Sequence, residues 1–184
     1  MRTLPLLLLT TLFPAAALAA PGKATPRMAK ANLKVTSSAF AANQAIPAQY
    51  TCDGAATAPP VAWSAVPGNT RSVAILVEDP DAPDGTFTHW LVTGLGPQTT
   101  SLAAGAALPQ GAVAAKNGKG DTGYSAPCPP TGLHHYVFHV YALETTIPAP
   151  SSKEDFLAAI TGHVLAEGQL IGTYQKSGTA SAQK

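Results

Sequence analysis

The stretch HHYVFHVYAL, residues 134–143, indicates the fold class of this 184-residue chain. It is rich in aromatic and β-branched residues, which favour strands. Successive side chains of a strand point to opposite faces, so His134 and Tyr136 share one face while His135 and His139 share the other. The stretch therefore predicts a strand that offers one histidine and one tyrosine to the same pocket.

A second strand is predicted at residues 73–77, a nearly continuous apolar run of the kind found in strands buried on both faces. It leads into EDPDAPDGTFTHW, residues 78–90, which crowds four carboxylates, two prolines and a histidine into one strand connection. Asp79 is the first polar residue on one face of that strand, and His89 opens the next predicted strand. We expect one end of a sheet to bring together four residues: Asp79, His89, His134 and Tyr136.

The remaining segments complete a mainly β pattern. Short strands or ordered loops are predicted at residues 33–36 and 45–63, a loop-rich excursion at 99–121, and a final strand at 169–174. Ser151 and Ser152 precede Glu154 and Asp155 in a capping-box-like helix start, Gly162 ends that helix, and residues 163–167 suggest a further helical turn. The strands do not alternate regularly with helices, which disfavours a doubly wound parallel sheet.

The N-terminus has the pattern of a secretory signal peptide, residues 1–19, with cleavage after Ala19. A membrane anchor is the alternative, but the apolar run is short and contains Pro5 and Pro14. No cysteine lies near the cleavage site, which disfavours a lipid anchor. The rest divides into a flexible lead-in (20–32), one domain (33–176) and a flexible tail (177–184). The protein is thus expected to be exported, to the periplasm or the medium.

Composition restricts the partners. The chain has 11 basic and 10 acidic residues, and cleavage would remove only Arg2 from this count, leaving a formal charge of zero. This balance argues against nucleic acid, whose binding rests on a basic surface, and provides no polybasic membrane handle. Cys52 and Cys128 are the only cysteines. In an exported chain they suggest one disulfide, with two separate thiols as the alternative.

Several motifs, in order and spacing, resemble the phosphatidylethanolamine-binding protein family, in particular its bacterial Raf-kinase-inhibitor-like branch. They are YTCDG (50–54), DPDAP (79–83), THW (88–90), GYSAPCPP (123–130), GLHHYVF (132–138) and GHVLAEGQLIGTY (162–174). The resemblance covers nearly the whole predicted domain. It implies a large antiparallel β-sheet packed with a smaller sheet, plus a few peripheral helices.

The resemblance also implies a small pocket for phosphate-like anions at one end of the central sheet. Its ligand-binding groups would be the side chains of Asp79, His89, His134 and Tyr136 and backbone near Ala126, Pro127 and Cys128, with Asp81 and Pro83 shaping the wall. This chain departs from the family at His135, where Arg or Lys is common. It also departs at KNGKGDTGY, residues 116–124, which lacks the family's aromatic residue and so alters the pocket rim.

Three classes of function follow from these residues. The first is a binding or regulatory protein, not an enzyme, that takes a small anionic or phosphorylated ligand. Because some relatives inhibit kinases or proteases, inhibition of a protein partner belongs to this class. The second is a small hydrolase using the same Asp, His and Tyr groups, although no persuasive nucleophile accompanies them. The third is a metal site of Asp79, His89 and His134, which no metal-binding motif supports. We expect the first, with no cofactor and no metal.

Overall fold

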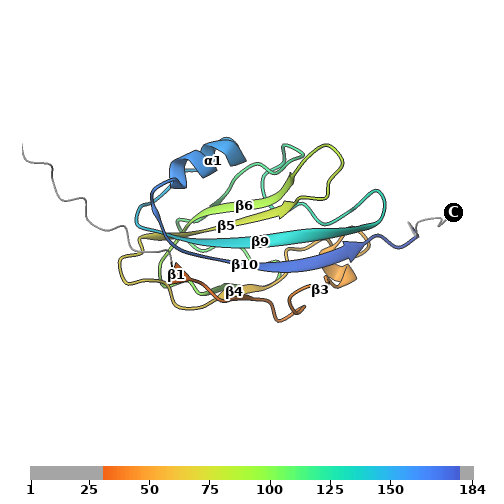
Figure 1. Ribbon diagram of the computed structural model, residues 1–184, viewed down its shortest axis with the longest axis horizontal. Coiled ribbons are helices and arrows are strands. Elements are labelled where there is room, and N and C mark those ends of the chain that lie inside the picture. Colours follow the sequence, from red (N-terminus) through yellow and green to blue (C-terminus); the bar gives the residue numbers. More distant parts are fainter. Residues whose placement is uncertain (1–30, 179–184) are drawn as a thin grey trace, which may run out of the picture.

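The computed structural model describes residues 31–178, and its centre is a seven-stranded sheet (Figure 1). Its antiparallel part has the order β10-β9-β5-β6-β8, and two short strands, β1 and β3, pair in parallel with β10. The predicted signal peptide, most of the lead-in and the end of the tail lie outside the described residues. The strands of this sheet are β1 (Ala31–Asn32), β3 (Gln44–Ala45), β5 (Ser72–Asp79), β6 (Phe87–Leu95), β8 (Val113–Ala114), β9 (Leu133–Leu143) and β10 (Val164–Gln175).

A smaller antiparallel sheet packs against the large one. It consists of β2 (Val35–Thr36), β4 (Val61–Trp63) and β7 (Ser101–Leu102), and a 3-10 helix, η1 (Ala48–Tyr50), lies between β3 and β4 along the chain. The structure therefore confirms the predicted class, a mainly β protein with a large sheet and a small one. The short strand β1 uses Ala31 and Asn32, which the sequence had placed in the flexible lead-in.

Each face of the large sheet covers a core of its own. Alternate residues of β5, Val73, Ile75 and Val77, face the small sheet and pack there with β9 residues such as Phe138. The intervening Leu76 faces the other side, where the α-helix covers it (Figure 1). Both faces of β5 are buried, which explains its nearly continuous apolar sequence.

The α-helix, α1 (Lys153–Ile160), begins as the sequence predicts. The Ser152 hydroxyl accepts a hydrogen bond from the Asp155 backbone N–H at 3.1 Å, and Phe156 is fully buried against the sheet. The predicted further turn at residues 163–167 is wrong: strand β10 begins at Val164, and Ala166 pairs with both β1 and β9. Pairing on both sides outweighs the weak local helix preference of Leu165, Ala166 and Glu167.

The edge of the sheet depends on one close approach. A Cβ placed on Gly168 of β10 would lie 2.0 Å from the Leu33 carbonyl oxygen and 2.8 Å from its carbon. Next to it, the Leu33 N–H donates to the Glu167 carbonyl at 2.8 Å. A side chain at position 168 would therefore force the backbone after β1 away from β10.

We expect Gly168→Ala to lower the free energy of unfolding by about 1–3 kcal/mol, the usual cost of forcing atoms into a filled space. Gly68→Ala is the matched control, because nothing lies within 4 Å of the added methyl group there. Urea unfolding of the two variants measures the difference. Equal stabilities would mean that the backbone after β1 moves aside without cost.

Candidate functional site

The ends of β5, β6 and β9 surround a cleft of about 970 Å³. The four residues that the sequence grouped together all line it: Asp79 from β5, His89 from β6, and His134 and Tyr136 from β9. Each of the four is at least nine-tenths buried. The cleft thus collects one carboxylate, two imidazoles and a phenol with little access to bulk water.

The carboxylate of Asp79 is held at both oxygens. Its Oδ2 accepts a hydrogen bond from His134 Nδ1 at 2.7 Å, and its Oδ1 accepts one from the Asp81 backbone N–H at 2.8 Å. An ionised carboxylate only accepts hydrogen bonds, so Nδ1 of His134 carries the hydrogen. Its Nε2 is then the ring nitrogen left for a ligand.

His89 reaches the cleft through an irregularity in β6. Val77 pairs with Trp90, but the next residue, Glu78, pairs with Thr88, so His89 is an extra residue in the β5–β6 ladder. Such a bulge redirects a side chain that strict alternation would send to the other face. The result is a ring centroid 5.1 Å from that of Tyr136, in edge-to-face geometry.

A backbone carbonyl fixes the orientation of His89. Its Nδ1 lies 2.6 Å from the Ser125 carbonyl oxygen, and a carbonyl only accepts, so Nδ1 carries the hydrogen. As in His134, Nε2 is the nitrogen left for a ligand. Burial lowers the pKa of His89, and the hydrogen bond to Ser125 and the charge of Asp79 oppose this shift only in part. Without a ligand the ring therefore favours its neutral form.

The hydroxyl of Tyr136 is buried and has no hydrogen-bond partner among residues 31–178. Burial also raises the pKa of this phenol, and the neighbouring Asp79 charge adds to the effect, so it remains a hydrogen-bond donor at any ordinary pH. Leaving such a group unsatisfied is costly, and native proteins rarely do so without a reason. An acceptor in the cleft would satisfy it.

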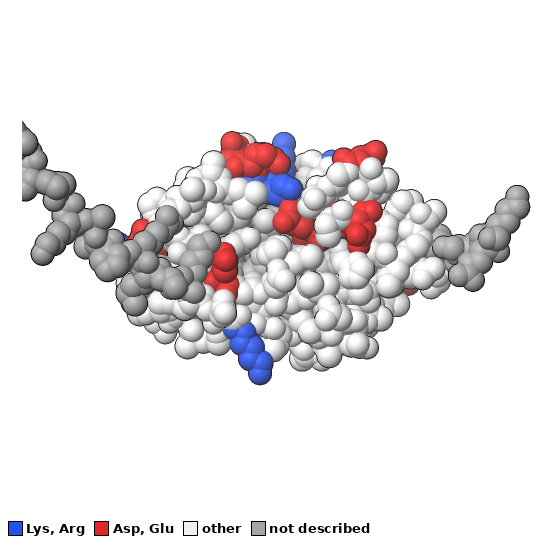
Figure 2. Space-filling view, viewed as in Figure 1, with Lys and Arg blue, Asp and Glu red and all other residues white. Residues whose placement is uncertain are grey.

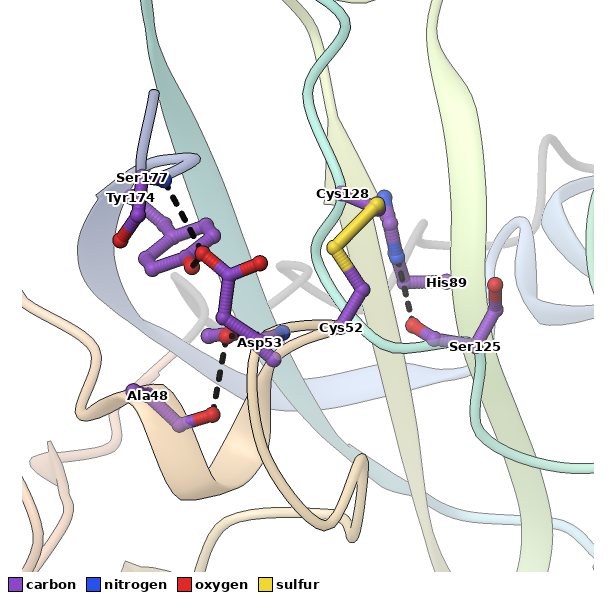
Figure 3. Close-up of a disulfide and its surroundings, with 9 residues drawn as sticks. Ala48, Cys52, Asp53, His89, Ser125, Cys128, Tyr174 and Ser177 are labelled. Atoms are coloured by element: carbon purple, nitrogen blue, oxygen red, sulfur yellow. Dashed lines mark hydrogen bonds between the residues drawn. A yellow bond between two sulfur atoms is a disulfide. The ribbon is translucent and has the colours of Figure 1, made fainter. Parts of the chain in front are cut away.

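A disulfide fixes the segment that supplies the Ser125 carbonyl. Cys52 and Cys128 are bonded, with Cα atoms 5.4 Å apart, and the Cys52 N–H donates to the Pro127 carbonyl at 3.0 Å. Figure 3 shows the disulfide close to the His89–Ser125 hydrogen bond. The two cysteines are 76 residues apart in the sequence. Cross-linking a loop of this length lowers the entropy of the unfolded chain, which stabilises the folded state by about 4 kcal/mol.

An exposed carboxylate anchors the other end of this connection. Asp53, next to the disulfide, accepts hydrogen bonds from the Tyr174 hydroxyl at 2.5 Å and from the Ser177 N–H at 3.0 Å (Figure 3). These bonds lower the pKa of the Asp53 carboxyl. The end of β10 is thereby tied to the same turn as the cleft segment.

Of the other residues that the sequence analysis named for the pocket, some line the cleft and some do not. Ala126, Cys128 and Pro83 line the cleft, whereas Asp81 and Pro127 are not among its lining residues. Asp81 instead accepts hydrogen bonds from both the backbone N–H and Nδ1 of His135, and these bonds lower its pKa. His135 is half exposed and points away from the four cleft residues, as its place in the strand predicts.

The structure adds cleft residues that the sequence did not single out. Phe87 packs edge-on against His89 with centroids 4.8 Å apart, and the Ser125 hydroxyl is buried there without a partner. Lys116 and Lys119 also line the cleft, as does the start of α1. The sequence contains a signal for the lysines, since both lie in the segment where the family pattern is altered.

Residues 31–178 contain neither a cluster of metal ligands nor a membrane-spanning helix. No three His, Cys, Asp or Glu side chains are placed so that they could hold a metal ion together. No helix in this part of the chain is both long and apolar enough to span a bilayer.

Comparison with known proteins gives the family. The sequence model described as phosphatidylethanolamine-binding protein matches residues 36–175. This chain belongs to the phosphatidylethanolamine-binding protein family. Family membership supports a binding protein of this type, and confirms the resemblance seen in the motifs.

Individual proteins are similar to this chain over most of its length. A UPF0098 protein of Methanothermobacter thermautotrophicus is 44% identical over 137 residues, which cover 71% of this chain and 91% of that protein. The crystal structure of CT736 from Chlamydia trachomatis, described as a homolog of phosphatidylethanolamine-binding protein, has 39% identity and a TM-score of 0.76, covering 79% of this chain and 99% of that one. The E. coli protein YbcL, described as a member of the mammalian family, has 32% identity and a TM-score of 0.74, covering 80% and 100%.

The buried histidines predict how stability depends on pH. Burial lowers the pKa of His89 and also of His139, so between the lowered values and about 6.5 the unfolded chain binds more protons than the folded one. The free energy of unfolding should therefore rise with pH through this window and fall on acidification. Urea unfolding between about pH 5 and pH 7.5 measures it, above the range in which carboxyl groups titrate.

His89→Asn separates the contribution of the site. An asparagine Nδ2 can still donate to the Ser125 carbonyl, but it does not titrate. The variant should show a smaller slope of unfolding free energy against pH than the unchanged protein. If the two slopes agree, His89 does not titrate differently in the folded and unfolded states.

Proposed function

We propose that this protein is an exported binding protein whose cleft holds a small anion, a phosphate or phosphoryl head group. The observation that carries the proposal is the buried Tyr136 hydroxyl without a partner, beside two histidines whose Nδ1 atoms are occupied elsewhere. The hydroxyl then remains as a donor to a ligand, and each Nε2 atom becomes a donor to the same ligand when its ring is protonated. Donors converging in a dry site suit a compact anion.

The nearby carboxylate does not prevent this role. Both Asp79 oxygens already accept hydrogen bonds, and the one from His134 delivers a ring whose far nitrogen is available to the anion. A bound anion also favours protonation of His89, which burial otherwise opposes. Binding should accordingly be coupled to proton uptake and tighten at lower pH.

Binding is favoured over hydrolysis by the state of Ser125, the serine that contacts His89. An activated serine is hydrogen-bonded to its base. Within the part of the chain that the structure describes, the Ser125 Oγ has no hydrogen-bond partner, and its residue contacts His89 through the Ser125 carbonyl instead. A regulatory role toward a protein partner remains part of the proposal.

Acidic and basic side chains are interspersed on the face shown in Figure 2, without a continuous basic patch there that would favour nucleic acid.

Calorimetric titration with phosphate, phosphorylethanolamine and acetate tests the anion site. We expect saturable phosphate binding, weakened at least about tenfold in Tyr136→Phe, because a hydrogen bond to a charged group contributes about 1.5–3 kcal/mol. His89→Asn should weaken binding similarly. His135→Ala is the matched control, since this histidine lies outside the cleft.

Two features make the outcome decisive. Tyr136→Phe removes a buried hydroxyl that has no partner, so it should not lower stability, and lost binding would not reflect unfolding. Sulfate, whose charge is constant over the range, should bind more tightly at pH 5.5 than at about pH 7.5 if His89 takes up a proton. Phosphate affinity unchanged in Tyr136→Phe would refute the proposed site.

Export is supported by two observations. The Cys52–Cys128 disulfide suits an oxidising compartment. A relative from Mycobacterium tuberculosis, 40% identical over 155 residues covering 82% of this chain and 76% of that protein, is named as a lipoprotein, LppC.

We expect the protein recovered outside the cytoplasm to begin at Ala20 and to contain no free thiol when unfolded without reductant. Mass spectrometry of the intact chain and a thiol assay measure both properties. An uncleaved N-terminus, or two thiols per chain in the exported fraction, would contradict this expectation.

A further inference from the structure

A short hairpin, residues 116–122, forms one rim of the cleft, and we call it the rim hairpin. A β-bridge joins Lys116 to Thr122, and the Asn117 N–H donates to the Asp121 carbonyl at 2.8 Å. The buried Asn117 side chain accepts from the Lys119 N–H at 2.9 Å and donates to the Gly123 carbonyl at 3.1 Å. The hairpin is therefore ordered by its own hydrogen bonds, independently of any ligand.

The rim hairpin is also fixed to the pocket. The Gly118 N–H donates to the Thr88 carbonyl of β6 at 2.8 Å. The Gly118 backbone lies so close to Phe87 that an added Cβ would be 2.5 Å from its ring, and the same ring packs against His89. A continuous line of contacts thus runs from the hairpin to the proposed anion site.

Two lysines of the rim hairpin present free charges to this cleft. Lys116 and Lys119 are exposed cleft residues, and neither forms an ion pair with a carboxylate of residues 31–178. Lys153, on another wall, differs in that Glu78 holds its ammonium group at 3.0 Å. The positive charge of Lys119 acts on His89 and contributes to lowering its pKa, so this ammonium group acts on the anion site itself.

The carboxylates of the cleft lie on other elements. Asp84 and Glu154 line it from the β5–β6 connection and from α1, and Asp79 uses both oxygens to accept hydrogen bonds from His134 and the Asp81 backbone N–H. The charged side chains that the rim hairpin brings to the cleft are both lysines. A cleft of about 970 Å³ is also far larger than one phosphate requires.

From these contacts we infer that the ligand is a small molecule with two anionic groups, one held by Tyr136 and the histidines and the other by the lysines of the rim hairpin. The inference rests on the proposed anion site and specifies its ligand class. A bisphosphate, a diphosphate or a phosphorylated carboxylic acid has the required chemistry. Ammonium groups on flexible stems suit the second group, because they accept different spacings between the two anions.

Calorimetry with four probes at fixed ionic strength tests the inference: phosphate, pyrophosphate, propane-1,3-bisphosphonate and phosphorylethanolamine. We expect at least one of the two doubly anionic probes to bind about tenfold more tightly than phosphate. Lys116→Ala/Lys119→Ala should remove this advantage, because it should weaken binding of the doubly anionic probes about tenfold more than binding of phosphate. Lys34→Ala is the matched control, an exposed lysine outside the cleft. Raising the salt concentration should reduce the advantage, as screening requires.

The outcomes distinguish this inference from the proposed function. Phosphate binding that depends on Tyr136, with no gain for either doubly anionic probe, would overturn the second subsite and leave the first. A gain that persists in the double lysine variant would also overturn it. Phosphorylethanolamine binding more tightly than both doubly anionic probes would replace it with a zwitterionic ligand, recognised through Asp84 or Glu154. If no probe binds the unchanged protein, the proposed function fails, and this inference fails with it.

Discussion

The antiparallel register between β5 and β9 is the constraint on which both the core and the cleft depend. Val77 pairs with Phe138, and these residues face the small sheet. Continuing the same ladder beyond its last pair brings Asp79 opposite Tyr136. A slip of one residue would turn Tyr136 toward the helix side and bury His135 in its place. The long apolar ladder therefore positions the polar groups at its end: the burial of many methyl groups fixes a geometry that the polar groups would not hold by themselves.

His89 completes the cleft through a departure from regular pairing. The bulge in β6 lets this ring face Tyr136, although Trp90, the next residue, packs in the core between the sheets. A bulge also interrupts the ladder and needs support from outside it. That support comes from the Ser125 carbonyl, whose own segment is held by the disulfide at Cys128. Order in the cleft thus depends on a covalent bond to a distant part of the chain.

The sequence was sufficient for the long strands and for bringing Asp79, His134 and Tyr136 to one end of the sheet, because period-two patterning and strand ends are local signals. It included His89 only because this residue opens a predicted strand. It was insufficient where tertiary contacts decide. The parallel pairing of β1 and β3 with β10 involves only two residues of each short strand, too few for a pattern. The helical turn expected at residues 163–167 is replaced by strand from Val164 onward, because β9 and β1 offer hydrogen-bonding partners there. The bulge at His89 and the docking of the rim hairpin on Phe87 likewise leave no periodic trace in the sequence.

The electrostatics of the cleft explain how a carboxylate and an anion site can share one small space. Asp79 uses both oxygens on internal donors, so it acts on the cleft mainly through His134, with which it forms a hydrogen-bonded pair. His89 has no such carboxylate partner, and burial therefore disfavours its charged form until an anion arrives. The two rings differ as a result: Nδ1 of His134 is held by a carboxylate, whereas in the proposed site His89 would take up a proton together with the anion. Lys119 adds a positive charge that opposes protonation of His89 in the empty cleft and attracts the anion that would reverse this effect. In the proposed site, an anion would accept a hydrogen bond from the protonated His89 ring and would also offset the repulsion between that ring and Lys119. The charge of the ligand is therefore the property to which the proposed site would respond most strongly.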